Sequence, residues 1–216
     1  MGGHPRDTEN VCVLGIDAAW TVHQPSGIAL VQNTGSGWSC MAVAPSYKAF
    51  LAQASGQTWD PRQKATGSRP DPAVLLQASQ QLAGAVVSCV SVDMPLATTP
   101  ITRRRAADTA ISSRFGHKGC AVHSPSAERP GAIADQLRAD FAALGCPLHT
   151  CGSDPAAPAL IECYPHVALL ALLERDYRVP YKVSRSGKYW KADQLSRRER
   201  IERLLKQFQA IKDGLD

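Results

Sequence analysis

The chain has 216 residues, 44% of them hydrophobic, and a net charge of +5 at pH 7. This composition excludes a disordered chain, and no stretch approaches the roughly 20 apolar residues needed to span a bilayer, so no membrane association is expected. The length predicts one domain over residues 11–216, behind a flexible N-terminus at residues 1–10. The N-terminus lacks a secretory pattern, and several of the seven cysteines lie within apolar runs. We therefore expect reduced, buried thiols and a cytoplasmic protein.

Three apolar runs near the N-terminus predict an antiparallel meander. The first runs from Val11 to Asp17, the second from Gly27 to Val31, and the third from Trp38 to Val43. A turn at residues 24–26 and a hairpin signal, Asn-Thr-Gly-Ser-Gly at residues 33–37, separate them. Strands joined this closely pair with their sequence neighbours.

The rest of the chain predicts helices alternating with two further strands. Asp71-Pro72 is a helix-start signal, since an aspartate caps the helix and proline suits its first position. That helix would bury Val74, Leu75, Ala78 and Leu82. Further helices are expected over 46–54, from Thr99 to Gly116, over 131–144 and over 167–173, with strands over 85–93 and 159–163.

The last predicted helix begins with a capping box. Ser196 and Glu199 are three residues apart, as the box requires. The helical spacing of the apolar residues that follow predicts one buried face, formed by Ile201, Leu204, Leu205, Phe208 and Ile211.

Three of the predicted strands carry a carboxylate at or near one end. These residues are Asp17, Asp93 and Glu162. Acidic residues at the carboxyl edge of such a sheet project toward the crevice where α/β proteins bind ligands. Carboxylates brought together there repel one another unless a hard cation such as Mg²⁺ or Mn²⁺ holds them. The pattern therefore indicates metal-assisted phosphoryl chemistry.

Five segments carry a resemblance to a known family. They are GIDAAW (15–20), PSGIAL (25–30), SVDMPL (91–96), RRRAADTAISSRFGHKGCAVHSP (103–125) and IECYPH (161–166). They resemble a family of uncharacterised proteins catalogued as predicted nucleases of ribonuclease-H-like fold. The resemblance implies an α/β, three-layer fold with a mixed five-stranded sheet, an antiparallel meander followed by parallel strands, flanked by helices.

The resemblance also implies a set of site residues. Asp17 would bridge two Mg²⁺ or Mn²⁺ ions, with Asp93 and Glu162 completing one each and Asp216 as a further ligand. Arg105 and Asp108 would face the site, with Arg105 steadying the scissile phosphate, and His166 would orient that phosphate or act as a general acid or base. The alternatives are structural: a turn cap at Asp17, an ion pair at Glu162, a surface pair on the helix carrying Asp108, and a structural hydrogen bond at His166.

Nucleic acid is the expected partner and phosphodiester hydrolysis the expected reaction. Cations interleave with aromatic rings at Tyr181, Lys182, Lys188, Tyr189, Trp190 and Lys191, as in single-strand-binding surfaces or in a charged rim packed by its rings. Two other functions stay open. One is an ATP-dependent phosphotransferase of the actin or sugar-kinase type, although the turn after Asp17 lacks glycine. The other is a non-catalytic binding protein. Cys146, His149 and Cys151 do not have zinc-site spacing, and we expect no metal there.

Overall fold

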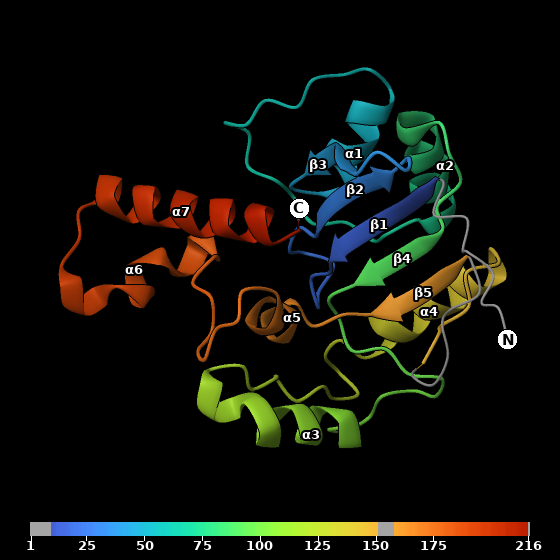
Figure 1. The fold of residues 1–216 in the computed structure, drawn as a ribbon. Coiled ribbons are helices and arrows are strands. Elements are labelled where there is room, and N and C mark those ends of the chain that lie inside the picture. Colours follow the sequence, from blue (N-terminus) through green and yellow to red (C-terminus); the bar gives the residue numbers. More distant parts are fainter. Residues whose placement is uncertain (1–9, 151–157, 216) are drawn as a thin grey trace, which may run out of the picture. The chain divides into compact units, whose positions relative to one another are not determined.

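The computed structural model describes residues 10–150 and 158–215 (Figure 1). The chain forms two compact units. Unit 1 comprises residues 1–104 and 125–163, and unit 2 comprises residues 105–124 and 164–216. Residues 1–9 of the predicted flexible N-terminus, Cys151 and Asp216 lie outside the described residues. Within the described ranges, no helix combines the length and apolarity needed to cross a membrane.

Unit 1 is built on a mixed five-stranded sheet. Its strands are β1 (Val11–Asp17), β2 (Gly27–Asn33), β3 (Trp38–Ala44), β4 (Cys89–Val92) and β5 (Ala159–Glu162). The order across the sheet is β3-β2-β1-β4-β5. β1 pairs antiparallel with β2, and β2 with β3, whereas β4 lies parallel to both β1 and β5. The predicted mixed sheet is confirmed, with antiparallel strands first and parallel strands after them.

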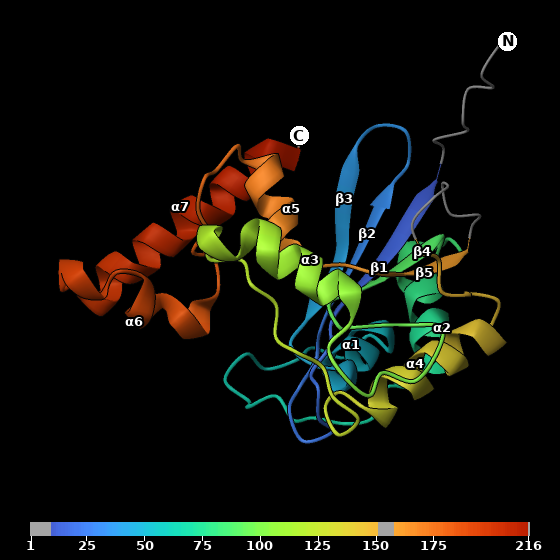
Figure 2. The ribbon, with the colours of Figure 1, turned by 90° about the horizontal axis from the view of Figure 1, so that it is seen from below.

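One face of the sheet carries the core of unit 1. Alternate residues of β1 are buried, as the two-residue period of a strand requires. They pack with Val90 and Val92 of β4 and with Phe50, Leu75 and Phe141 of three helices. These helices are α1 (Tyr47–Ala54), α2 (Pro72–Ala83) and α4 (Ala132–Ala143). Figure 2 shows them on one side of the sheet.

Two helices of unit 1 begin as their sequence predicts. The Ser46 hydroxyl accepts a hydrogen bond from the Ala49 N–H at the start of α1, and the Asp71 carboxylate accepts one from the Val74 N–H at the start of α2. Gly84, with φ +64°, ends α2. The prediction that Val74 is buried is wrong, because it lies on the outer side of α2 with 39% exposure.

The Asp71 cap has a measurable expected effect. Asp71→Ala is expected to lower the free energy of unfolding by about 1 kcal/mol, because one N–H at the helix start then loses its partner. Urea denaturation measures this change. Gln81→Ala, at an exposed position of the same helix, is the control and is expected to change stability by less than about 0.5 kcal/mol.

Unit 2 is largely helical. Its elements are α3 (Ala106–Phe115), η1 (Gly116–Lys118), α5 (Pro165–Leu172), η2 (Val183–Arg185), α6 (Ser186–Tyr189), η3 (Lys191–Asp193) and α7 (Arg197–Leu215).

The predicted end of α3 is confirmed, whereas its predicted start is wrong. The sequence predicts a start at Thr99, but the cap of α3 is Arg105 and the helix follows it. Gly116 is the C-cap of α3, as predicted, and the short 3-10 helix η1 that follows it ends at Gly119, with φ +75°. The residue types of a helix start are therefore present at Thr99-Pro100 although no helix begins there.

The predicted burial of α7 is largely wrong. Leu204 is buried, but Ile201, Leu205 and Phe208 are 46%, 58% and 40% exposed. The spacing correctly predicts the helix and its capping box, in which Glu199 accepts a hydrogen bond from the Ser196 N–H. It cannot predict which side of an amphipathic helix finds a packing partner.

Candidate functional site

Two of the predicted acidic residues lie side by side at the carboxyl edge of the sheet of unit 1. The parallel register pairs Ile16 of β1 with Val92 of β4, so Asp17 and Asp93 follow at the same level. The Asp93 N–H donates to the Ile16 carbonyl at 2.8 Å, which extends the ladder by one residue. Because neighbouring strands in register present side chains on the same face, the two carboxylates share one face of the sheet.

Cys163 is the third member of this row. The register pairs Val92 with Glu162, and the Cys163 N–H donates to the Val92 carbonyl at 2.9 Å. Cys163 is therefore level with Asp93. The sequence predicts only a buried thiol inside a strand at this position. The parallel register of β4 and β5 places Cys163 beside the two aspartates.

The thiol of Cys163 is influenced by its burial and by the acids at this strand end. Burial is the largest cause of the raised pKa of its thiol, and a hydrogen bond with Ser91 acts in the opposite direction. The negative charges of Asp93, Glu162 and Asp17 raise the pKa of Cys163 further. One thiol thus senses all three carboxylates, which come from three different strands or strand ends.

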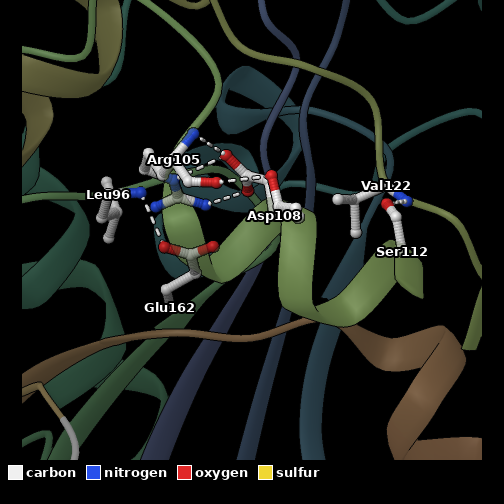
Figure 3. Close-up of polar contacts among 7 residues, drawn as sticks. Leu96, Arg105, Asp108, Ser112, Val122 and Glu162 are labelled. Carbon is white, nitrogen blue, oxygen red and sulfur yellow. Dashed lines mark hydrogen bonds and ion pairs between the residues drawn. The ribbon is translucent and has the colours of Figure 1, made fainter. Parts of the chain in front are cut away.

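Glu162 occupies a different position from the two aspartates. It is level with Val92 and so, by alternation along the strand, projects from the opposite face. Its Oε2 accepts a hydrogen bond from the Leu96 N–H at 2.9 Å (Figure 3). This bond ties β5 to the segment that follows Asp93, so Glu162 helps to fix the position of Asp93.

The three acids do not form a closed metal cage. Among the described residues, no group of three or more His, Cys, Asp and Glu side chains is arranged to hold a metal ion. What the sheet places together is the pair Asp17 and Asp93. Asp17 is exposed and Asp93 half-buried.

The turn after β1 is closed by internal contacts. The Ala19 N–H donates to the buried Ser26 hydroxyl at 3.0 Å, and Ala18 is 7% exposed. Trp20 packs against the core of unit 1. A phosphotransferase of the actin type needs backbone N–H groups in this turn for its phosphates. In this turn the Ala19 N–H is already hydrogen-bonded to Ser26, which disfavours the phosphotransferase alternative.

Arg105 and Asp108 form a two-contact ion pair in unit 2 (Figure 3). Arg105 donates through Nη2 to Oδ1 at 2.6 Å and through Nε to Oδ2 at 3.0 Å. The Arg105 backbone N–H also donates to Oδ2, at 2.9 Å, which caps α3. The Asp108 side chain is 4% exposed and that of Arg105 17%. Asp108 therefore fixes the guanidinium of Arg105 at the start of the helix.

His166 lies at the start of α5 and is 4% exposed. Its ring contacts the rings of Tyr164 and Tyr181, with centroids 5.5 and 5.3 Å apart. Arg178 Nη2 lies 2.6 Å from Nε2 of His166. A guanidinium only donates, so Nε2 accepts and the proton of the neutral ring sits on Nδ1. Any proton transfer by His166 would have to use Nδ1.

The described cysteines are free thiols. They are Cys12, Cys40, Cys89, Cys120, Cys146 and Cys163. The prediction of buried thiols concerns the cysteines of the apolar runs. It holds for Cys12, whereas Cys89 and Cys163 are only half-buried and Cys40 is exposed, because β3 has only one packed end. Cys151 of the Cys-His-Cys segment lies outside the described residues.

The family model described as "protein of unknown function (DUF429)" matches residues 15–214. The chain belongs to this family. No curated protein and no solved structure matches the chain. The DUF429 match contains Asp17, Asp93, Glu162, Arg105, Asp108 and His166.

The DUF429 segment thus divides its candidate residues between the two units. Unit 1 holds the pair Asp17 and Asp93, with Glu162 behind it, and unit 2 holds Arg105, Asp108 and His166. Two residues that sequence reasoning missed belong beside them. Cys163 is level with the aspartates in the sheet, and Arg178 holds His166. Only the alternation of IECYPH at a strand end could have pointed to Cys163.

Proposed function

We propose that this DUF429 protein is a divalent-metal-dependent nuclease with a ribonuclease-H-like, three-layer fold. The observation that carries the proposal is the juxtaposition of Asp17 and Asp93 at the carboxyl edge of a sheet ordered β3-β2-β1-β4-β5. An antiparallel meander followed by parallel strands, with an acid ending β1 and another following β4, is the arrangement that such a fold uses for its metal site. The resemblance of the motifs in the sequence supports the same assignment.

The residues present suit a hard divalent cation. Asp17 and Asp93 offer carboxylate oxygens from neighbouring strands, the donors that Mg²⁺ and Mn²⁺ prefer, and an open site leaves room for water ligands. A cation bound there would activate a water molecule and stabilise the departing oxygen. Glu162 contributes by holding the segment after Asp93. Asp216 remains a proposed ligand.

The residues of unit 2 suit a phosphate substrate. Asp108 binds the Nε and Nη2 groups of Arg105 and so fixes the orientation of its guanidinium, and a phosphate would be recognised by the charge and the remaining donors of that group. Unit 2 carries fifteen Lys and Arg against eight Asp and Glu, a net charge of +7, whereas unit 1 carries nine against eleven, a net charge of −2. A polyanionic substrate such as DNA or RNA would be attracted to the positively charged unit 2. At the negatively charged unit 1 it would need a bound cation.

The test is a cleavage assay with purified full-length protein. Labelled single- and double-stranded DNA and RNA are incubated with Mn²⁺, with Mg²⁺ and with EDTA. We expect cleavage of at least one substrate with a divalent ion and none with EDTA. Cleavage that persists unchanged in EDTA, or the lack of cleavage of all four substrates with both ions, would overturn the proposal.

A non-catalytic binding protein is the second candidate. The observations that favour it are the lack of a three-residue metal group among the described residues and the structural hydrogen bond of Glu162. Thermal melting separates the two functions, because a ligand of the folded state raises the midpoint. A nuclease is expected to melt higher in Mn²⁺, and Asp17→Asn to lose that shift. No shift with any divalent ion, together with a more stable Asp17→Asn variant, would favour the binding protein.

A further inference from the structure

A buried histidine in unit 2 is surrounded by cations. His166 accepts a hydrogen bond from Arg178, whose Nη1 also donates to the Gly119 carbonyl at 3.5 Å. The pKa of His166 falls to about 3, first because of burial and then because of the positive charges of Arg178, Lys182 and Arg185. Arg178 contacts the imidazole directly, and the Arg185 N–H donates to the Lys182 carbonyl at 2.9 Å, so the other two cations lie on one short turn.

These cations lack acidic partners within the described residues. The ion pairs of unit 2 that the structure describes are Arg105–Asp108, Lys118–Asp176, Arg198–Glu202 and Arg203–Asp193. None of them contains Arg178, Lys182 or Arg185. Like charges held together without a counterion destabilise the fold, so the cluster gains most from a bound anion.

Two buried polar atoms of this histidine–arginine pair also lack partners in the described chain. They are Nδ1 of His166 and Nε of Arg178. Both carry hydrogens, since Arg178 occupies Nε2 of the ring and a guanidinium Nε is always protonated. Buried donors of this kind are normally satisfied, so two at one cluster of cations indicate a position that accepts an oxygen-rich ligand.

An aromatic ring adjoins the cluster. Tyr181 contacts the His166 ring, and Lys182 Nζ lies 6.0 Å from the centroid of the Tyr181 ring. Lys182 and Tyr181 are half-buried and Arg185 is exposed, so the cluster reaches the surface. Cations combined with a ring are the means by which proteins bind single strands, whose phosphates meet the cations and whose bases stack.

We propose that Arg178, Lys182 and Arg185 form a binding subsite for the backbone phosphates of single-stranded nucleic acid, with Tyr181 as its aromatic neighbour. The inference rests on the proposed function, because it assigns a surface for that function's substrate. It concerns binding without a metal ion, and residues of unit 2 alone. A neutral imidazole can position Arg178 by accepting a hydrogen bond from it. The positive charge of Arg178 is then not neutralised and can attract a phosphate.

The test is fluorescence anisotropy with a labelled single-stranded oligonucleotide, full-length protein and EDTA, over a series of salt concentrations. The double variant Lys182→Gln/Arg185→Gln is expected to bind about tenfold more weakly than wild type. The slope of log K against log salt concentration should be shallower by about 1.4, because two phosphate contacts are lost. The control is Lys206→Gln/Lys212→Gln, which removes the same charge from exposed positions of α7 and is expected to weaken binding less than about twofold.

The outcomes separate this inference from the nuclease proposal. If both double variants bind equally weakly, net charge alone governs binding and the proposed subsite is wrong. The proposal is also wrong if the wild type does not bind the oligonucleotide. Inorganic phosphate that raises the melting midpoint, with no oligonucleotide binding, would also overturn it in favour of a free-phosphate site. Cleavage assays of Asp93 variants test unit 1 and stand whichever way the binding result falls.

Discussion

Asp93→Asn is expected to slow Mn²⁺-dependent cleavage by at least about 100-fold, equivalent to about 2.7 kcal/mol of transition-state stabilisation. The substitution keeps the size of the side chain and replaces one charged oxygen with an amide nitrogen. Asp93 follows β4 directly, and its backbone N–H bonds to β1 whatever its side chain is. The fold should therefore survive while the pair Asp17 and Asp93 loses half of its charge.

The control for this variant is Asp140→Asn, the same chemical change in α4 of unit 1. The Asp140 carboxylate accepts a hydrogen bond from Gln136 on the surface of the helix and takes no part in the row at the sheet edge. We expect wild-type cleavage from it. Melting curves without metal should be similar for all three proteins. If Asp93→Asn cleaves at the wild-type rate, the proposed site is not the catalytic one.

The sheet could be predicted from the sequence because each strand has its own apolar run and short connections order the first three. The position of Asp17 and Asp93 at the edge of the sheet could also be predicted, because each ends an apolar run. The row's third member could not be predicted, because only the parallel pairing of β4 and β5 shows that Cys163, rather than Glu162, is level with Asp93. Register between distant strands depends on the whole packed sheet, which local patterns do not contain.

The helices of unit 2 show where local patterns fail. Thr99-Pro100 has the residue types of a helix start, yet Asp108 caps the chain at Arg105. A carboxylate three residues inside a helix outweighs a proline, because it satisfies an N–H and forms an ion pair at once. The cluster around His166 joins residues 119, 166 and 178–185 through contacts between separate segments, so spacing could not indicate it.

His166 is expected to make the folded state lose stability as the pH falls below 6.5. The pKa of this buried ring is lowered to about 3, whereas the unfolded chain has the ordinary value of 6.5. Between these values the unfolded chain binds the proton and the folded chain does not, so stability is complete above pH 6.5 and decreases toward pH 3. The loss between pH 7.5 and pH 5 should be about 2 kcal/mol.

Urea denaturation of wild type and His166→Gln across this pH range measures the effect. Glutamine keeps an acceptor for Arg178 but does not titrate, so the variant's stability should vary with pH by about 2 kcal/mol less than that of the wild type. Ser113→Ala, at an exposed position of α3, is the control and should follow the wild type, because it changes no ionisable group. Matching pH dependence in wild type and His166→Gln would mean that the ring takes up its proton over the same pH range in the folded and the unfolded chain. Once protonated, the ring could not accept a hydrogen bond from Arg178. This result would contradict the hydrogen bond on which the cation cluster depends.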